Sequence, residues 1–182
     1  MRRRPSHVLR LTSYLTGMPD LLQALAGVPN ASLPLPGLAT AGQPSAAALT
    51  AFRDAGGQVV LDIRDPMEPR PFDEPALVRQ LGMEYVNLSV RHGALDDWVM
   101  DQILEVVRDR GAANRPLLFH CASANRVAGA LIPYFILDRG MDEEAAVETA
   151  MRLGLRGADL MEWGLDYARR KAGSQGTREP GS

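Results

Sequence analysis

The stretch from residue 116 to 127, Pro-Leu-Leu-Phe-His-Cys-Ala-Ser-Ala-Asn-Arg-Val, restricts the fold more than any other part of the chain. A short apolar run leads into His120 and Cys121, the only cysteine among 182 residues. Small residues follow as far as Arg126, and the next run is apolar and long enough for a helix. The pattern predicts a strand, a tight loop and a helix. Backbone N–H groups in such a loop, together with the helix N-terminus, can hold an oxyanion. Cys121 and Arg126 would present a nucleophile and a bidentate clamp to that group.

Strand and helix signals alternate along the rest of the chain. Strands are expected at residues 58–63, 84–90 and 117–119, where the sequence is β-rich, alternating or apolar. Periodic apolar residues, caps and glycine stops predict helices at 20–26, 45–55, 75–81, 96–108, 126–137, 141–153 and 159–171. This order predicts an α/β fold with a central, mostly parallel sheet flanked by helices.

Ligands in such folds bind beyond the carboxyl ends of the strands. That edge is expected to carry Arg64 and Asp65 after the first strand, Arg91 and His92 after the second, and Cys121 after the third. The chemistry-bearing residues of three separate segments should therefore meet there.

We expect three parts in the chain. Residues 1–40 form an N-terminal extension, because prolines and glycines punctuate them as an extended loop. Residues 41–172 form the α/β domain, and residues 173–182, rich in Gly, Ser and Pro, form a disordered tail. Pro133 lies inside an expected helix and should kink it or end it early.

Composition excludes several classes of function. The net charge of −2 provides no basic field for nucleic acid, and no apolar run is long enough to cross a membrane. A single cysteine forms no internal disulfide and suits a reducing compartment, so a cytoplasmic location is expected. Three scattered histidines and one cysteine predict no metal site, and no G-x-x-x-x-G-K motif is present, so we expect no cofactor.

The segment from His120 to Val127 resembles the signature loop of cysteine-dependent phosphatases. More specifically, it is similar to the bacterial protein-tyrosine-phosphatase-like family that also occurs fused to β-lactamase-like hydrolases. The likeness covers roughly residues 40 to 155, with landmarks at residues 42–45, 60–64, 82–87 and 140–155. It implies a cysteine-phosphatase-like fold. It also implies hydrolysis of phosphomonoesters through a phosphocysteine, of the protein tyrosine or dual-specificity type, on a phosphorylated protein or a small phosphate ester.

The resemblance also implies roles for the loop residues. Cys121 would be the nucleophile and Arg126 the clamp on the phosphoryl oxygens, while His120 would orient the loop and stabilise the thiolate. The remaining positions would bind the phosphoryl group through backbone N–H groups: Ala122, Ser123, Ala124 and Asn125. The structural alternatives are a buried cysteine that packs as a small hydrophobe, a surface arginine, and a core histidine bonded to a carbonyl group.

A phosphatase also needs an acid that protonates the leaving oxygen. The family places an aspartate in the loop after the second strand, where Asp96 and Asp97 are the only acids. Both are equally explained as caps of the helix that follows. His92 is a second candidate, because imidazole can donate a proton near neutral pH.

Three features of the loop depart from the pattern of tyrosine phosphatases. Only four residues separate Cys121 from Arg126, which is also the spacing of rhodanese-type sulfurtransferases. Ala124 stands where glycine is usual, at a cost of about 1 kcal/mol if that position needs a positive φ. Val127 replaces the usual hydroxyl residue. Two alternatives therefore stay open beside the phosphatase: a rhodanese-like sulfurtransferase, and a phosphate-binding pseudophosphatase.

Overall fold

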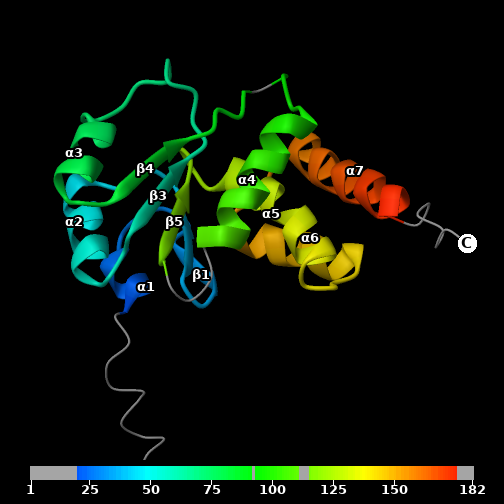
Figure 1. The fold of residues 1–182 in the computed structure, drawn as a ribbon, viewed down its shortest axis with the longest axis horizontal. Coiled ribbons are helices and arrows are strands. Elements are labelled where there is room, and N and C mark those ends of the chain that lie inside the picture. Colours follow the sequence, from blue (N-terminus) through cyan, green and yellow to red (C-terminus); the bar gives the residue numbers. More distant parts are fainter. Residues whose placement is uncertain (1–19, 92, 111–114, 176–182) are drawn as a thin grey trace, which may run out of the picture.

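The computed structural model describes residues 20–91, 93–110 and 115–175. Within these ranges the chain forms a five-stranded sheet and seven helices (Figure 1). The strands are β1 (Ser32–Leu35), β2 (Leu38–Ala41), β3 (Val59–Asp62), β4 (Glu84–Asn87) and β5 (Leu117–His120). The helices are α1 (Leu21–Ala24), α2 (Ala46–Asp54), α3 (Glu74–Gln80), α4 (Asp97–Arg110), α5 (Asn125–Leu137), α6 (Glu143–Leu153) and α7 (Ala158–Gln175).

The sheet has the order β1-β2-β5-β3-β4, and only the β1–β2 pair is antiparallel. The predicted α/β architecture with a mostly parallel sheet is therefore confirmed. Strand β5 is central, and His120 at its end pairs with Ala41 of β2 on one side and Asp62 of β3 on the other. Three strands thus end level with one another just before Cys121.

Helices cover both faces of the sheet. Helices α1, α2 and α3 lie on one face, and α4 to α7 lie on the other (Figure 1). Because alternate residues of a strand point to opposite faces, Val60 packs with Phe52 of α2, whereas Leu61 packs with Leu131 of α5 and its neighbours. Strands buried on both faces read as continuous apolar runs, as the sequence of β3 does.

Strands β1 and β2 fall where an extended loop was expected. Pro34 lies within β1, which is an edge strand, and an edge tolerates proline because one side of the strand needs no N–H donor. Strand β2 is Leu-Ala-Thr-Ala, so its small residues give little strand signal although all four are buried. The division of the chain at residue 40 stays a prediction, but the segment before it contributes two strands to the sheet.

One expected helix end agrees with the structure and another differs. Helix α5 continues past Pro133 and ends at Leu137, as expected, so the early end given as one of two possible effects of Pro133 does not occur. Proline cannot donate to the carbonyl group four residues earlier, and that group, on Gly129, faces Gly164 of α7 instead. Helix α7 includes residues 173–175, the first part of the expected tail, while residues 176–182 lie outside the described ranges. No described helix is both long and apolar enough to span a bilayer.

Candidate active site

The predicted loop connects the end of β5 to the start of α5. Cys121 is buried, with 1% of its surface exposed, and Ala122 and Ser123 lie at the surface. Ala124 has φ 68° and ψ −5°, a left-handed conformation, and it precedes the first turn of α5 without a side-chain cap. A left-handed residue turns the chain sharply, which lets so short a loop join a buried strand to a buried helix.

The loop has free donors where an anion would bind. Four backbone N–H groups donate to no acceptor in the described part of the chain: those of Ala122, Ser123, Asn125 and Arg126. These groups precede or begin a helix of 13 residues, whose N-terminus carries a partial positive charge. Free N–H groups at a helix N-terminus are suited to binding an oxyanion.

The segment before α2 supports one side of the loop. Gly42 and Ser123 form an isolated β-bridge, and the backbone N–H of Gln43 donates to the carbonyl oxygen of Ala122 over 3.0 Å. A β-carbon on Gly42 would lie 2.9 Å from that same oxygen, so only glycine allows this approach. Asn30 Nδ2 also donates to the Ser123 carbonyl oxygen, over 2.9 Å.

The segment between α6 and α7 supports the other side. Asn125 Oδ1 accepts hydrogen bonds from the backbone N–H groups of Arg156, over 2.7 Å, and Gly157, over 3.1 Å. The Asn125 side chain therefore anchors the loop to this segment rather than facing a ligand.

Arg126 is 5% exposed and is held by a carboxylate that sequence reasoning missed. Its Nη1 and Nη2 donate to Glu68 Oε1 and Oε2 over 2.5 and 2.9 Å, and Nη1 also donates to the Val90 carbonyl oxygen over 3.1 Å. Hydrogen bonds from Arg126 lower the pKa of Glu68 to about 2, although partial burial acts in the opposite direction. The pKa of Arg126 is raised by Glu68, and the neighbouring Cys121 adds to this effect against burial.

Arg64 joins the two sides of the site. It is 4% exposed and donates to Glu68 Oε2 over 3.4 Å, to the Pro69 carbonyl oxygen over 2.5 Å, and to Gln43 Oε1. Gln43 Nε2 in turn donates to Glu74 Oε2 over 2.8 Å. Arg64 thus braces the surroundings of the loop.

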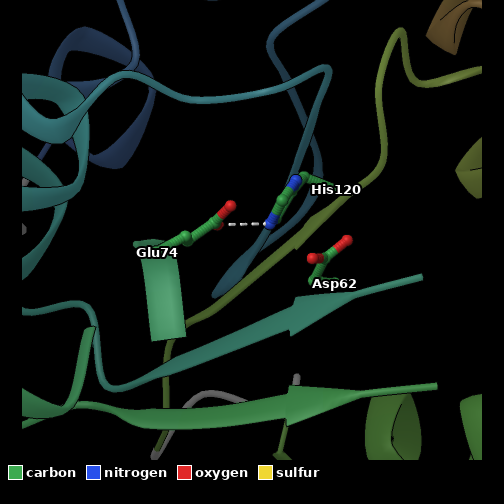
Figure 2. Close-up of side chains that lie close together, drawn as sticks. All are labelled: Asp62, Glu74 and His120. Carbon is green, nitrogen blue, oxygen red and sulfur yellow. Dashed lines mark ion pairs between the residues drawn. The ribbon is translucent and has the colours of Figure 1, made fainter. Parts of the chain in front are cut away.

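His120 lies beneath the loop and has no exposed surface. Its Nε2 is 2.7 Å from Glu74 Oε1 (Figure 2), and its Nδ1 is 3.3 Å from the Cys121 carbonyl oxygen. Burial lowers the pKa of His120, but the hydrogen bond and charge of Glu74, followed by the charge of Asp62, outweigh it, so the pKa is raised. Nothing in the sequence around His120 points to this partner, because Glu74 lies far from His120 along the chain.

Asp62, Glu74 and His120 bring three possible metal ligands within 4.8 Å of one another (Figure 2). Their geometry does not fit an ion. Asp62 Oδ1 accepts from the Arg64 backbone N–H, and its Oδ2 accepts from Arg70 and Tyr85, each over 2.8 Å. The 2.7 Å between His120 Nε2 and Glu74 Oε1 is typical of an ion pair, whereas two donors of a tetrahedral metal site with bonds of about 2.0–2.2 Å lie about 3.4 Å apart. The cluster is a buried ion-pair network.

The predicted acids have other partners in the structure. Asp96 Oδ1 accepts from the Val99 backbone N–H over 2.8 Å, so Asp96 caps α4. Asp97 pairs with Arg170 of α7, with an Nη2–Oδ1 distance of 2.7 Å. In the described ranges neither bonds to the loop, and their role as acid stays a prediction. His92 lies outside these ranges.

Some of the residues expected to meet at the carboxyl ends of the strands do contact one another. Arg91, after β4, forms an ion pair with Asp65, after β3. Both lie at the sheet edge that carries Cys121, as the strand order predicts.

The fold and the loop define a class of protein: the chain has the fold of the cysteine-dependent phosphatases. No family model matches the sequence, and a search of curated proteins found no match either. Solved structures do match. A DUF442 protein from Shewanella putrefaciens CN-32 is 19% identical with a TM-score of 0.67, over 82% of this chain and 97% of that one.

Two further structures are similar. The catalytic domain of the PP-IP phosphatase Siw14 from S. cerevisiae is 16% identical with a TM-score of 0.64, over 84% of this chain and 96% of that one. TpbA from P. aeruginosa is 22% identical with a TM-score of 0.61, over 78% of this chain and 84% of that one. At these identities the likeness concerns the fold, and it confirms the fold that the resemblance implied.

Proposed function

We propose that this protein is a cysteine-dependent phosphatase that hydrolyses phosphomonoesters through a phosphocysteine. One observation carries the proposal: Cys121 and the buried Arg126 flank a loop whose free N–H groups stand at the N-terminus of α5. A nucleophile, a cationic fork and a set of N–H donors around one point suit the displacement of a phosphoryl group.

In the first step, the Cys121 thiolate attacks phosphorus in line with the leaving oxygen. The S–P bond forms, the P–O bond breaks, and the leaving oxygen takes a proton from an acid. The loop N–H groups and Arg126 stabilise the charge on the equatorial oxygens. Asp96 and Asp97 remain the proposed acids, and each would first have to leave the partner it now holds.

In the second step, water attacks the phosphocysteine. The S–P bond breaks, the thiolate is restored, and inorganic phosphate leaves. The hydrogen bonds that hold Arg126 to Glu68 keep the guanidinium in one orientation through both steps, and such fixed charge needs little reorganisation during the reaction.

The substrate class that we propose is a phosphorylated protein, of the tyrosine or dual-specificity kind, or a small phosphate ester. Two structures of similar fold support this class: Siw14 is a PP-IP phosphatase, and TpbA has been solved in complex with pTyr. We further propose a cytoplasmic location, because a reduced Cys121 is required for the attack.

Hydrolysis of p-nitrophenyl phosphate tests the proposal. The wild-type protein is expected to release p-nitrophenol, and Cys121→Ser is expected to lose this activity. The matched control is Ser123→Ala, which alters an exposed side chain of the same loop but leaves the backbone N–H in place. Wild-type activity no greater than that of Cys121→Ser contradicts the proposal.

The wild-type protein and the same variants also distinguish the phosphatase from two alternative functions. The four-residue spacing between Cys121 and Arg126 favours a sulfurtransferase, which would form thiocyanate from thiosulfate and cyanide. The other partners of Asp96 and Asp97 favour a pseudophosphatase, which would bind phosphate in calorimetry without turning over any ester. Phosphate release without thiocyanate formation excludes both.

A further inference from the structure

Glu74 is a fully buried carboxylate, which is unusual in a folded protein. It is the first residue of α3, and none of its surface is exposed. Burying a charge is costly unless it is paired and hydrogen-bonded. Glu74 Oε2 accepts from Gln43, and Oε1 faces His120 Nε2. In the described part of the chain, Glu74 Oε1 and His120 Nε2 have no other polar partner.

Both ring nitrogens of His120 face oxygen atoms that accept hydrogen bonds. Nε2 faces the Glu74 carboxylate at 2.7 Å (Figure 2), and Nδ1 faces the Cys121 carbonyl oxygen at 3.3 Å. A neutral imidazole carries a proton on one nitrogen only, whereas imidazolium carries one on each. The surroundings therefore suit the imidazolium form.

The charges around the ring support that form. Glu74 comes from α3 and Asp62 from β3, while Cys121 follows His120 on its own segment. Arg70 and the Tyr85 hydroxyl donate to Asp62 Oδ2. The raised pKa of His120 agrees with this arrangement.

We propose that Glu74 is a positioning residue for the reaction, which acts through His120 on Cys121. Its carboxylate holds the ring as imidazolium; the imidazolium donates to the Cys121 carbonyl oxygen and favours the thiolate at the base of the loop. The role in turnover rests on the proposed phosphatase function, but the effect on the cysteine does not depend on it.

The same carboxylate reaches the other end of the loop. Through Gln43 it connects to Arg64, then to Glu68, and so to Arg126. One hydrogen-bonded chain thus links the group beneath the nucleophile to the clamp. Glu74 is placed to set the geometry of both.

Alkylation of Cys121 as a function of pH tests the proposal directly. Because the chain has one cysteine, iodoacetamide reports on this residue alone. Glu74→Gln keeps the size of the side chain and removes its charge, so the ring loses its second proton. An opposite charge at close range shifts a titration by about one unit or more, so we expect the midpoint of the alkylation curve to rise by about one pH unit. Below the midpoint the rate should fall about tenfold.

Asp73→Asn is the matched control. Asp73 precedes Glu74 and caps α3 through the Ala76 backbone N–H, and asparagine caps as well as aspartate does. It removes a negative charge one position away without touching His120. Its alkylation curve should coincide with that of the wild type, whereas an unchanged curve in Glu74→Gln overturns the proposal.

A second measurement uses a protein in which Glu74 is intact, in case Glu74→Gln fails to fold. The chain has three histidines, so the double variant His7→Asn/His92→Asn leaves His120 alone. Nitrogen-15 NMR at pH 7 should show both ring nitrogens protonated; a ring with one bare nitrogen overturns the proposal. A shifted alkylation curve without any phosphatase activity would instead reject the proposed function and leave the Glu74 inference standing.

Discussion

At the scale of single residues, Ala124 is where the chain is most restricted. Its φ of 68° is one that L-amino acids with a side chain seldom adopt, and Asn30 is the only other non-glycine residue with positive φ in the described ranges. The conformation costs alanine about 1 kcal/mol relative to glycine. This cost was expected only if residue 124 has a positive φ, and the observed φ meets that condition.

Ala124→Gly should therefore raise the free energy of unfolding, by at most about 1 kcal/mol, because glycine also increases the entropy of the unfolded chain. Urea unfolding at pH 7 measures the change. The control is Ala122→Gly in the same loop, where φ is not positive and only the unfolded-state effect remains, so a loss of about 0.5–1 kcal/mol is expected. Equal losses in both variants would contradict the account.

The proposed nucleophile and clamp, Cys121 and Arg126, could be identified from the sequence, but the carboxylates beside Arg126 and His120 could not. Cys121 and Arg126 stand close together in one motif, and the motif carries their chemistry. Glu68 and Glu74 lie far from it along the chain, in a polar, proline-rich loop and at a helix start. Only the fold brings them to Arg126 and His120, because the register of β3 and β5 aligns the two segments.

At the scale of elements, α5 and α7 pack closely at two glycines. A β-carbon on Gly164 would lie 2.6 Å from the Gly129 carbonyl oxygen, and one on Gly129 would lie 2.9 Å from the Leu160 carbonyl oxygen. Helix α5 carries the free N–H groups of the site at its first turn. Its contact with α7 therefore fixes the direction in which that turn points.

Gly164→Ala should destabilise the protein by about 1–3 kcal/mol, because two backbones would have to separate. Gly173→Ala, in the same helix with no atom within 4 Å of its would-be side chain, should instead stabilise by up to about 1 kcal/mol. Thermal unfolding of the two variants beside the wild type gives the comparison. Loss of stability in both would show that alanine is disfavoured throughout α7 for another reason.

Element prediction succeeded where local signals were strong and failed where they were weak. Ser45 caps α2 through the Ala48 backbone N–H, as the sequence predicts. Strand β2 was missed because two of its four residues are alanine, which has a low strand propensity. Its strand conformation depends on pairing with β5, which lies nearly eighty positions further along the chain. Pairing between such distant segments cannot be recognised from a short stretch of sequence.

At the scale of the whole molecule, acid should weaken the fold through its ion pairs. Glu68 has a pKa of about 2 in the folded protein and an ordinary value of 4.5, because Arg126 donates to it. A lowered folded-state pKa contributes stability that is fully present above pH 4.5 and is lost as the pH falls through about 2. Glu143 has a lowered pKa for the same reason, with Arg169 as its partner.

The Glu68→Gln variant should thus be less stable than the wild type at pH 7, and the difference should shrink between pH 4.5 and pH 2. Urea unfolding at pH 7, 5, 4 and 3 measures it. Glu105→Gln serves as the control, because Glu105 is exposed and has no ion pair among the described residues. A difference for Glu68→Gln that stays constant with pH would show that the pair with Arg126 does not form in solution.

The residues that contact the loop from Cys121 to Arg126 come from widely separated positions in the chain, so the loop depends on late steps of folding. Asn30, Gln43, Glu68, His120 and Arg156 all contact the loop or its clamp, so the cradle is complete only when segments from both ends of the chain have docked. Contacts of large sequence separation form late in folding and slow it. During refolding, helical structure should return before the loop can bind an anion. The rate at which anion binding recovers should therefore report the last stage of folding.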